Sequence, residues 1–229
     1  MPVRKKAPED LTAKKALALE VIRRLKAEYP DAGCTLDYDH AWQLLVSVRL
    51  AAQCTDARVN IVVEELFAKY PSVAALAAAE PEDIEAIVKP CGLGHSKARD
   101  ISACMRMLRD KYNCQVPTTF EELLALPGVG RKSANLIMGD VFGEPAIVTD
   151  THCIRLCNKI GLVDGIKEPQ KVEMALWKII PPEEGSDLCH RFVMHGRAVC
   201  NARKPECEKC CLNDICRYAR EQSGADTAQ

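Results

Sequence analysis

Two glycines followed at once by two basic residues could bind a phosphate. Gly128 and Gly130 lie in the segment Leu-Pro-Gly-Val-Gly, and Arg131 and Lys132 come directly after it. The glycines permit a tight reversal of the chain, after which a helix can resume at Lys132. The start of such a helix offers unpaired backbone N–H groups and a positive dipole end, which can hold a phosphate. The segment therefore predicts a helix–hairpin–helix suited to sequence-independent DNA binding, with a plain connection between helices as the alternative.

Four cysteines toward the C-terminus have the spacing of metal ligands. Six, two and five residues separate Cys200, Cys207, Cys210 and Cys216. Four thiolates suit either a tetrahedral zinc ion or an iron–sulfur cluster, and the spacing alone does not choose between them. Cys211 adjoins Cys210, but the spacing to the neighbouring cysteines favours Cys210 as the ligand. We expect a metal site in this loop.

The composition limits how the protein can meet a nucleic acid. The 229 residues are 48% hydrophobic and 28% charged, and the net charge is −1. A nearly neutral chain lacks the overall attraction of a basic domain, so DNA binding must come from local placement of charge. The cysteine-rich loop offers such a place, because it contains Arg203 and Lys204. We expect Lys209, Arg191 and Arg197 to join them in a basic patch, the alternative being an ordinary solvated surface.

The elements that must position these residues are predicted to be helices. Apolar residues recur at steps of three and four along the chain, as in Ala98, Ile101, Met105, Leu108 and Tyr112. Since no long run alternates with period two, we expect an all-α fold of about ten short helices. Asp56 and Ser96 are the expected N-caps of two of them.

The odd count of 13 cysteines, in a chain that opens without an apolar signal-like stretch, indicates thiols and metal ligands rather than disulfides. No apolar run approaches 20 residues, so we expect no transmembrane helix. The sequence predicts a cytoplasmic protein without a membrane partner.

Separated motifs together resemble one known family. The hairpin segment is followed by Val-Thr-Asp-Thr-His, which contains Asp150 and His152, and then by Arg155. From about Ala16 to Arg217 the chain resembles the endonuclease III family of helix–hairpin–helix DNA glycosylases. The resemblance implies an all-α fold of two helical lobes with a DNA-binding cleft between them. Residues 39–142 would form the central lobe with the hairpin, and residues 1–38 plus 143–229 the other lobe, with a [4Fe–4S] cluster on the four cysteines.

The resemblance also implies the chemistry. Lys132 would be the nucleophile and Asp150 its partner in a bifunctional DNA N-glycosylase and AP lyase. A lysine amine can attack C1′ of a deoxynucleotide, displace the base and hold the sugar as a Schiff base, from which β-elimination breaks the strand. Asp150 would stabilise the positively charged sugar or move a proton. The expected partner is double-stranded DNA that contains oxidised pyrimidines or abasic sites, bound by a monomer associated with the nucleoid.

Two further positions match the family's DNA-inserting loops. Gln53 matches the residue that fills the space opposite the estranged base, and Leu93, between two glycines, matches the intercalating residue; a helix-end polar residue and a core leucine are the alternatives. The chain departs from the common pattern at Cys91, at Gly94 with His95, and at Leu124, which bears on the preferred lesion. We expect DNA contacts from Gln53, Leu93, Gly128, Gly130, Arg131, His152, Arg203 and Lys204.

Two rival functions share parts of this pattern. An adenine-mismatch glycosylase has the hairpin, the aspartate and the cluster but usually lacks the lysine, so Lys132 argues against it. A non-catalytic iron–sulfur DNA-binding module would keep the fold without the chemistry, and the pair Lys132 and Asp150 argues against that module.

Overall fold

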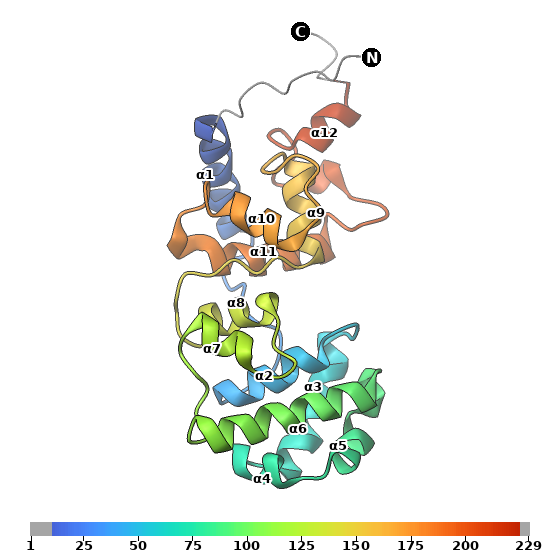
Figure 1. Cartoon of the computed structure of the whole chain (residues 1–229). Coiled ribbons are helices and arrows are strands. Elements are labelled where there is room, and N and C mark those ends of the chain that lie inside the picture. The colour runs from blue at the N-terminus through green and yellow to red at the C-terminus, as the bar shows by residue number, and fades with distance from the viewer. Residues whose placement is uncertain (1–10, 225–229) are drawn as a thin grey trace, which may run out of the picture. The chain divides into compact units, whose positions relative to one another are not determined.

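The computed structural model describes residues 11–224, and all the regular secondary structure in that range is helical. This confirms the predicted all-α class. The chain divides into two compact units, one of Cys34–Glu144 and the other of the described parts of Met1–Gly33 and Pro145–Gln229 (Figure 1). None of the helices in the described range has the length and apolar character needed to cross a bilayer.

The unit Cys34–Glu144 contains seven α-helices and one 3-10 turn. They are α2 (Ala41–Leu50), α3 (Asp56–Lys69), α4 (Val73–Ala78), α5 (Pro81–Val88), η1 (Lys89–Cys91), α6 (Gly94–Lys111), α7 (Phe120–Ala125) and α8 (Arg131–Asp140).

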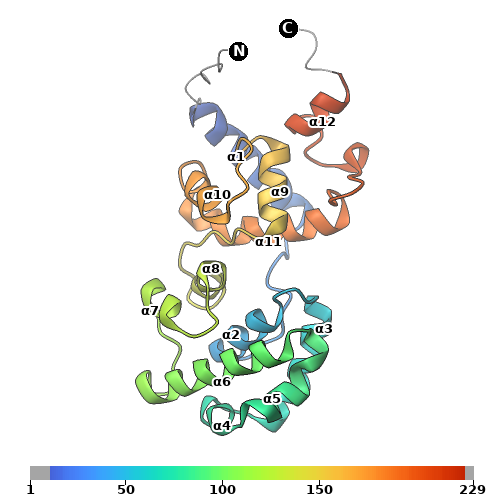
Figure 2. The same ribbon diagram turned by 45° about the vertical axis from the view of Figure 1, so that its right-hand side comes forward.

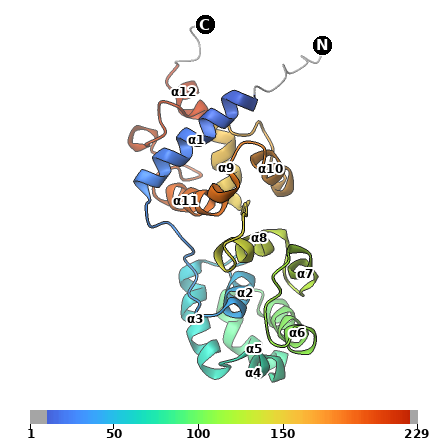
Figure 3. The same ribbon diagram turned by 90° about the vertical axis from the view of Figure 1, so that its left-hand side faces the viewer.

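Helix α2 forms the centre of this unit. It contacts α3, α6 and α8 (Figure 3), and its side chains from Trp42 to Ser47 are all buried. A helix that is apolar on nearly every side is stable only when other helices surround it. The long helix α6 packs against α4 and α5 through the predicted apolar face (Figure 2), and Ile101, Met105 and Leu108 are at most 2% exposed.

Both expected N-caps in this unit are wrong by one to three residues. Thr55 caps α3 by accepting a hydrogen bond from the backbone N–H of Arg58, so Asp56 is already the first helical residue. Helix α6 begins at Gly94, and its N-cap is Leu93 in the left-handed conformation. Ser96 lies within the first turn of α6 and accepts a hydrogen bond from Arg49 Nη2 at 3.1 Å.

The second unit consists of α1 (Leu11–Glu28), α9 (Thr151–Ile160), α10 (Pro169–Leu176), η2 (Pro182–Glu184), α11 (Gly185–Ala198), η3 (Cys207–Lys209) and α12 (Arg217–Gln222). Helix α11 packs against α1 and α9, and α12 also packs against α9. The apolar stripe of α1, which includes Val21 and Leu25, is fully buried. These contacts give α9 a rigid support.

An extended segment leads into α9 and is held by α11. Residues 146–149 are buried, and the backbone N–H of Val148 donates to Cys189 Sγ at 3.3 Å. Gly185, at the start of α11, lies so close to this segment that a Cβ there would clash with the Ala146 carbonyl oxygen and contact Ile147. The glycine therefore lets two backbones meet, and it fixes the point where α9 begins.

This contact predicts that Gly185→Ala destabilises the protein by about 2 kcal/mol, because backbone atoms cannot move aside as a flexible side chain can. Gly33→Ala is the matched control: a Cβ at Gly33 meets no atom within 4 Å, so its effect should stay within about 0.5 kcal/mol. Urea unfolding followed by circular dichroism measures both free energies. Equal stability of the two variants would contradict the proposed packing.

Candidate functional site

The glycine-rich segment joins α7 to α8 as a tight hairpin. Gly128 has φ +75°, a conformation in which a side chain is strained. A Cβ at this position would also lie 2.9 Å from Asp100 Cβ and 3.1 Å from Arg49 Cδ. Both conformation and space therefore require glycine at 128. A Cβ at Gly130 would meet no atom within 4 Å, so the packing of the protein does not require a glycine there.

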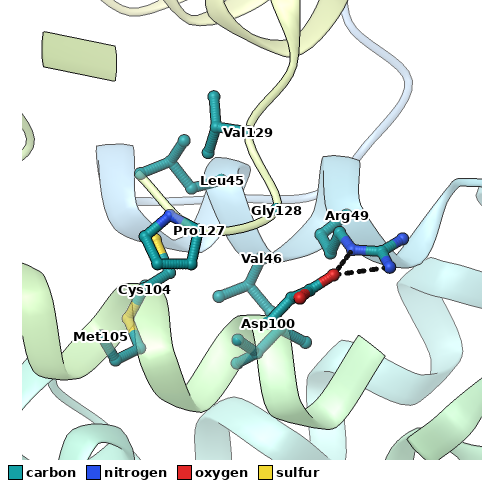
Figure 4. A pocket seen from close by; sticks show the side chains of 10 residues that line it. Leu45, Val46, Arg49, Asp100, Cys104, Met105, Pro127, Gly128 and Val129 are labelled. Carbon is teal, nitrogen blue, oxygen red and sulfur yellow. Dashed lines mark hydrogen bonds and ion pairs between the residues drawn. The ribbon is translucent and has the colours of Figure 1, made fainter. Parts of the chain in front are cut away.

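An ion pair and an apolar surface hold the hairpin in place. Arg49 of α2 pairs with Asp100 of α6 through Nε and Oδ2 at 2.7 Å, directly beneath Gly128 (Figure 4). Pro127 and Val129 flank the glycine and lie beside apolar side chains of the same two helices, which include Leu45, Val46, Cys104 and Met105. The hairpin is thus seated on a rigid framework.

Lys132 is exposed at the second position of α8, two residues after the last glycine of the hairpin. The N-cap of α8 is Gly130, which has no side chain to bond the first N–H groups, and the first turn contains no acidic residue. Arg131 lies with its guanidinium 5.1 Å from the centroid of the Phe120 ring. The start of α8 therefore combines backbone donors, a positive dipole end and two cations.

Asp150 is the N-cap of α9 in the other unit. Its Oδ1 accepts a hydrogen bond from the backbone N–H of Cys153 at 2.7 Å, which fixes the orientation of the carboxylate. The residue before it, Thr149, is 5% exposed, whereas Asp150 is half-buried. Lys132 and Asp150 thus belong to different units, and each is held by the start of a helix.

His152 packs inside its own unit. Its Nδ1 lies 3.1 Å from Arg155 Nη2, which also donates to the carbonyls of Gly196 at 3.1 Å and Cys200 at 2.9 Å. A Cβ at Gly196 would clash with the His152 ring. These contacts tie the first turn of α9 to α11 and to the cysteine-rich loop.

Gln53 and Leu93 lie at the tips of two loops of the unit Cys34–Glu144. Both are exposed, and the exposed fraction of Leu93 is 56%, so this leucine is not a core residue. Both have left-handed backbones, with φ 58° at Gln53 and φ 52° at Leu93. Residues other than glycine rarely adopt this conformation, and those that do concentrate at functional sites.

The four cysteines of predicted ligand spacing line one cavity of about 280 Å³, counting its opening to solvent. Lys159 and Tyr218 also line the cavity, and the Lys159 ammonium lies 4.1 Å from the centroid of the Tyr218 ring. Cys211 is not among the lining residues. The cavity therefore gathers Cys200, Cys207, Cys210 and Cys216 around one space.

Two nitrogen atoms lie within hydrogen-bond distance of the Cys210 sulfur. The backbone N–H of Leu212 donates to it at 3.4 Å, and His195 Nε2 lies 3.3 Å away. His195 is 1% exposed, and its Nδ1 lies 3.0 Å from the hydroxyl of Tyr29. In the described part of the chain, no group of three or more His, Cys, Asp or Glu side chains converges on a single metal ion.

The basic patch of the structure contains fewer cations than the sequence predicts. Arg203 and Lys204 are exposed on the cysteine-rich loop, as is Arg197 at the end of α11. Lys209 forms an ion pair with Glu206 at 2.5 Å, and Arg191 is only 2% exposed. Arg191 therefore does not belong to the surface patch, because its guanidinium donates to the backbone carbonyl of Tyr29 and pairs with Asp187 inside its unit.

The structure also identifies residues that the sequence pattern did not single out. Lys97 is completely buried, and the pair of Arg49 and Asp100 supports the hairpin. The helical periodicity could have identified Lys97, because this residue lies four residues before Ile101 and therefore on the buried face of α6. A lysine on an otherwise apolar stripe is rarely buried, which hid its role.

The chain resembles known proteins over most of its length. Residues 46–182 match the family described as HhH-GPD superfamily base excision DNA repair protein. Endonuclease III of Synechocystis is 42% identical over 211 residues, which cover 92% of this chain and 96% of the relative. Endonuclease III of Escherichia coli K12 is 38% identical over 204 residues, which cover 89% of this chain and 96% of the relative.

A solved structure of a trapped endonuclease III–DNA covalent intermediate has 40% sequence identity to this chain and a TM-score of 0.86. The alignment covers 91% of this chain and 98% of that one. The likeness therefore extends over both units rather than over the hairpin alone. Because residues 46–182 match this family and the relatives are similar over most of the chain, the chain belongs to the endonuclease III family of HhH-GPD base excision DNA repair proteins.

Proposed function

We propose that Lys132 and Asp150 carry the chemistry of this chain, which is a base excision repair DNA glycosylase and AP lyase. The observation that carries the proposal is the position of Lys132, exposed at the start of the helix that follows a rigidly seated hairpin. A similar endonuclease III has been trapped as a covalent intermediate with DNA, and a covalent bond to DNA requires a nucleophile on the protein.

DNA binding would begin at the hairpin. Gly130 leaves the first N–H groups of α8 without a side-chain cap, and a phosphate oxygen can accept them. The absence of a Cβ at Gly130 lets that phosphate approach the backbone closely. Because these contacts are to the sugar–phosphate backbone, they position the enzyme on any sequence. Gly128, Arg131, His152, Arg203 and Lys204 are further proposed contributors to this DNA-binding surface.

Lys132 would form two bonds in succession to one sugar carbon. The neutral amine attacks C1′, the glycosidic bond breaks, and the base leaves with a proton. The sugar ring then opens at the C1′–O4′ bond, O4′ takes up a proton, and the nitrogen forms an iminium with C1′. This iminium withdraws electrons from C2′, so loss of a C2′ proton expels the 3′ phosphate by β-elimination. Water then releases the sugar fragment and restores the amine. The single lysine thus accounts for both base removal and strand cleavage.

Asp150 would act on the charge that develops on the sugar. As the base departs, the sugar ring becomes positively charged, and a fixed carboxylate stabilises that charge without reorganising. The hydrogen bond from Cys153 N–H to Oδ1 holds the carboxylate in one orientation before DNA arrives. The same carboxylate can take or return the proton that the amine must lose.

Gln53 and Leu93 would enter the duplex when the damaged nucleotide leaves it. Extrusion costs a few kcal/mol of stacking and pairing, which inserted side chains partly replace. We assign Gln53 to the space opposite the unpaired base and Leu93 to the stack between neighbouring bases. We propose oxidised pyrimidines as the substrates and a monomer as the form of the enzyme. Because its substrate would be genomic DNA, we also propose that it acts at the nucleoid.

The cysteine cavity would hold a [4Fe–4S] cluster. Four thiolates around one space, with an N–H donor beside Cys210, suit this cofactor, whose sulfurs commonly accept hydrogen bonds. Base removal needs no electron transfer, so the cluster would supply rigidity to the loop that carries Arg203 and Lys204. The rival functions are not favoured, since the similar relatives are endonuclease III.

Removing the nucleophile should abolish covalent capture. We expect Lys132→Ala to form no borohydride-trapped complex with abasic duplex DNA and to lose strand cleavage by at least about a thousandfold. Lys111→Ala, which removes an exposed lysine at the end of α6, should trap DNA like the unchanged protein. Undiminished trapping by Lys132→Ala would refute the assignment.

Replacing the carboxylate without losing the cap separates its two roles. Asparagine can still accept the hydrogen bond from Cys153 N–H, so Asp150→Asn should fold with near-normal stability. Loss of the negative charge should nevertheless slow base removal by about 10²–10³-fold. Single-turnover release of thymine glycol, compared with thermal unfolding, measures both effects. A rate near that of the unchanged protein would show that Asp150 serves only as a cap.

The cofactor can be tested by metal content. The purified protein should absorb broadly in the visible range and contain about four irons per chain. Cys207→Ser should lose this iron, whereas Cys211→Ser should keep it, because Cys211 does not line the cavity. Stoichiometric zinc, or iron loss from Cys211→Ser equal to that from Cys207→Ser, contradicts the proposed ligand set.

A further inference from the structure

Lys97 is a buried lysine whose side chain serves none of the roles assigned so far. It lies in the first turn of α6 and is 0% exposed. Its Nζ donates to the carbonyl oxygens of Leu50 and Cys91, both at 2.8 Å. Both of these acceptors are neutral backbone groups, and burial lowers the pKa of Lys97. Lysines are almost never fully buried without a specific requirement.

The two carbonyls occupy equivalent places in two different elements. Leu50 is the last residue of α2, and Cys91 is the last residue of η1. The last carbonyl oxygens of a helix receive no hydrogen bond from an N–H group of the same helix, so they need a donor from elsewhere. A single ammonium from α6 supplies that donor to both ends, and it also suits the negative end of the helix dipole.

The DNA-inserting loops begin directly after these two carbonyls. Gln53 is three residues beyond Leu50, and Leu93 is two residues beyond Cys91. Lys97 also holds the second loop through its backbone, since its N–H donates to the carbonyl of Leu93 at 3.0 Å. Lys97 therefore forms hydrogen bonds at the base of both loops and at the tip of the Leu93 loop.

Both loop tips need such support. Gln53 and Leu93 have positive φ values, and an exposed residue with a strained backbone relaxes unless its surroundings prevent it. Their exposed side chains gain little packing from the protein itself. The contacts that can hold the loops in shape are therefore at their bases, where Lys97 lies.

We propose that Lys97 is a positioning residue for base extrusion, which sets the spacing of the Gln53 and Leu93 loops so that both side chains enter the duplex together. The inference rests on the insertion roles proposed above. Without the two hydrogen bonds, the ends of α2 and η1 move independently, and the side chains no longer present one rigid wedge. Lys97 does not touch the reacting atoms.

Single-turnover rates on two substrates test the proposal, with all proteins assayed well below their unfolding temperatures. One duplex carries thymine glycol opposite adenine, and the other carries it opposite an abasic analogue, where less stacking must be replaced. Lys97→Met keeps the apolar stem and removes the donors. We expect it to slow base release about tenfold on the paired duplex and less than about threefold on the other.

Two matched variants make the result specific. Lys111→Met changes an exposed lysine of the same helix and should leave both rates unchanged. Lys97→Gln retains a shorter donor and should lie between the unchanged protein and Lys97→Met, which also provides a folded variant if the methionine is not tolerated. Adding Lys97→Met to Gln53→Ala with Leu93→Ala should cost less than about twofold further, because coupled residues are not additive.

The outcomes separate the two proposals. If Gln53→Ala with Leu93→Ala is slow on the paired duplex but the Lys97 variants slow both duplexes equally, or add their full effect to the double variant, only the positioning role is overturned. If the double variant releases the base as fast as the unchanged protein, the insertion roles fail and the positioning role fails with them.

Discussion

The buried ammonium of Lys97 imposes the tightest constraint on the unit Cys34–Glu144. A charged group without water is stable only where other groups replace its hydration, and here the carbonyls of Leu50 and Cys91 do so. Leaving such a buried carbonyl unpaired costs about 1–3 kcal/mol. The ends of α2 and η1 must therefore stay at hydrogen-bond distance from the start of α6. The hairpin depends on the same helices, because its seat is the pair formed by Arg49 of α2 and Asp100 of α6.

The positions of the charged residues matter more in this protein than its net charge. The net charge is −1, yet the start of α8 gathers Arg131, Lys132 and a helix terminus without a side-chain cap. The start of α9 is arranged in the opposite way, since the carboxylate of Asp150 caps it. One helix start thus remains open for an anion, whereas the other carries a fixed negative charge. The same backbone feature would bind a phosphate in one case and orients the proposed catalytic carboxylate in the other.

The sequence predicted the features that depend on local pattern. Helical periodicity predicted the buried face of α6, and the glycine-rich segment predicted the hairpin, because both follow from neighbouring residues. The features that depend on distant contacts were not predicted. Burial of Lys97 requires the ends of α2 and η1 to meet α6, and burial of Arg191 requires the backbone of Tyr29. The N-cap of α3 was not predicted either, because the hydroxyl that caps the helix belongs to Thr55, one residue before the expected Asp56.

The backbone strain at Gln53 and Leu93 is a free-energy cost that the protein meets when it folds and not when it binds. A left-handed backbone at such a residue costs about 1–3 kcal/mol, which glycine would largely avoid. Glycine, however, has no side chain to insert. Ordering a flexible loop on DNA would cost about 0.5–1.5 kcal/mol for each immobilised side chain, at the step where extrusion already consumes stacking energy. A protein whose core is stable can absorb the strain once, so in the proposed roles the loops would meet the duplex in their working conformation and binding energy would remain for extrusion.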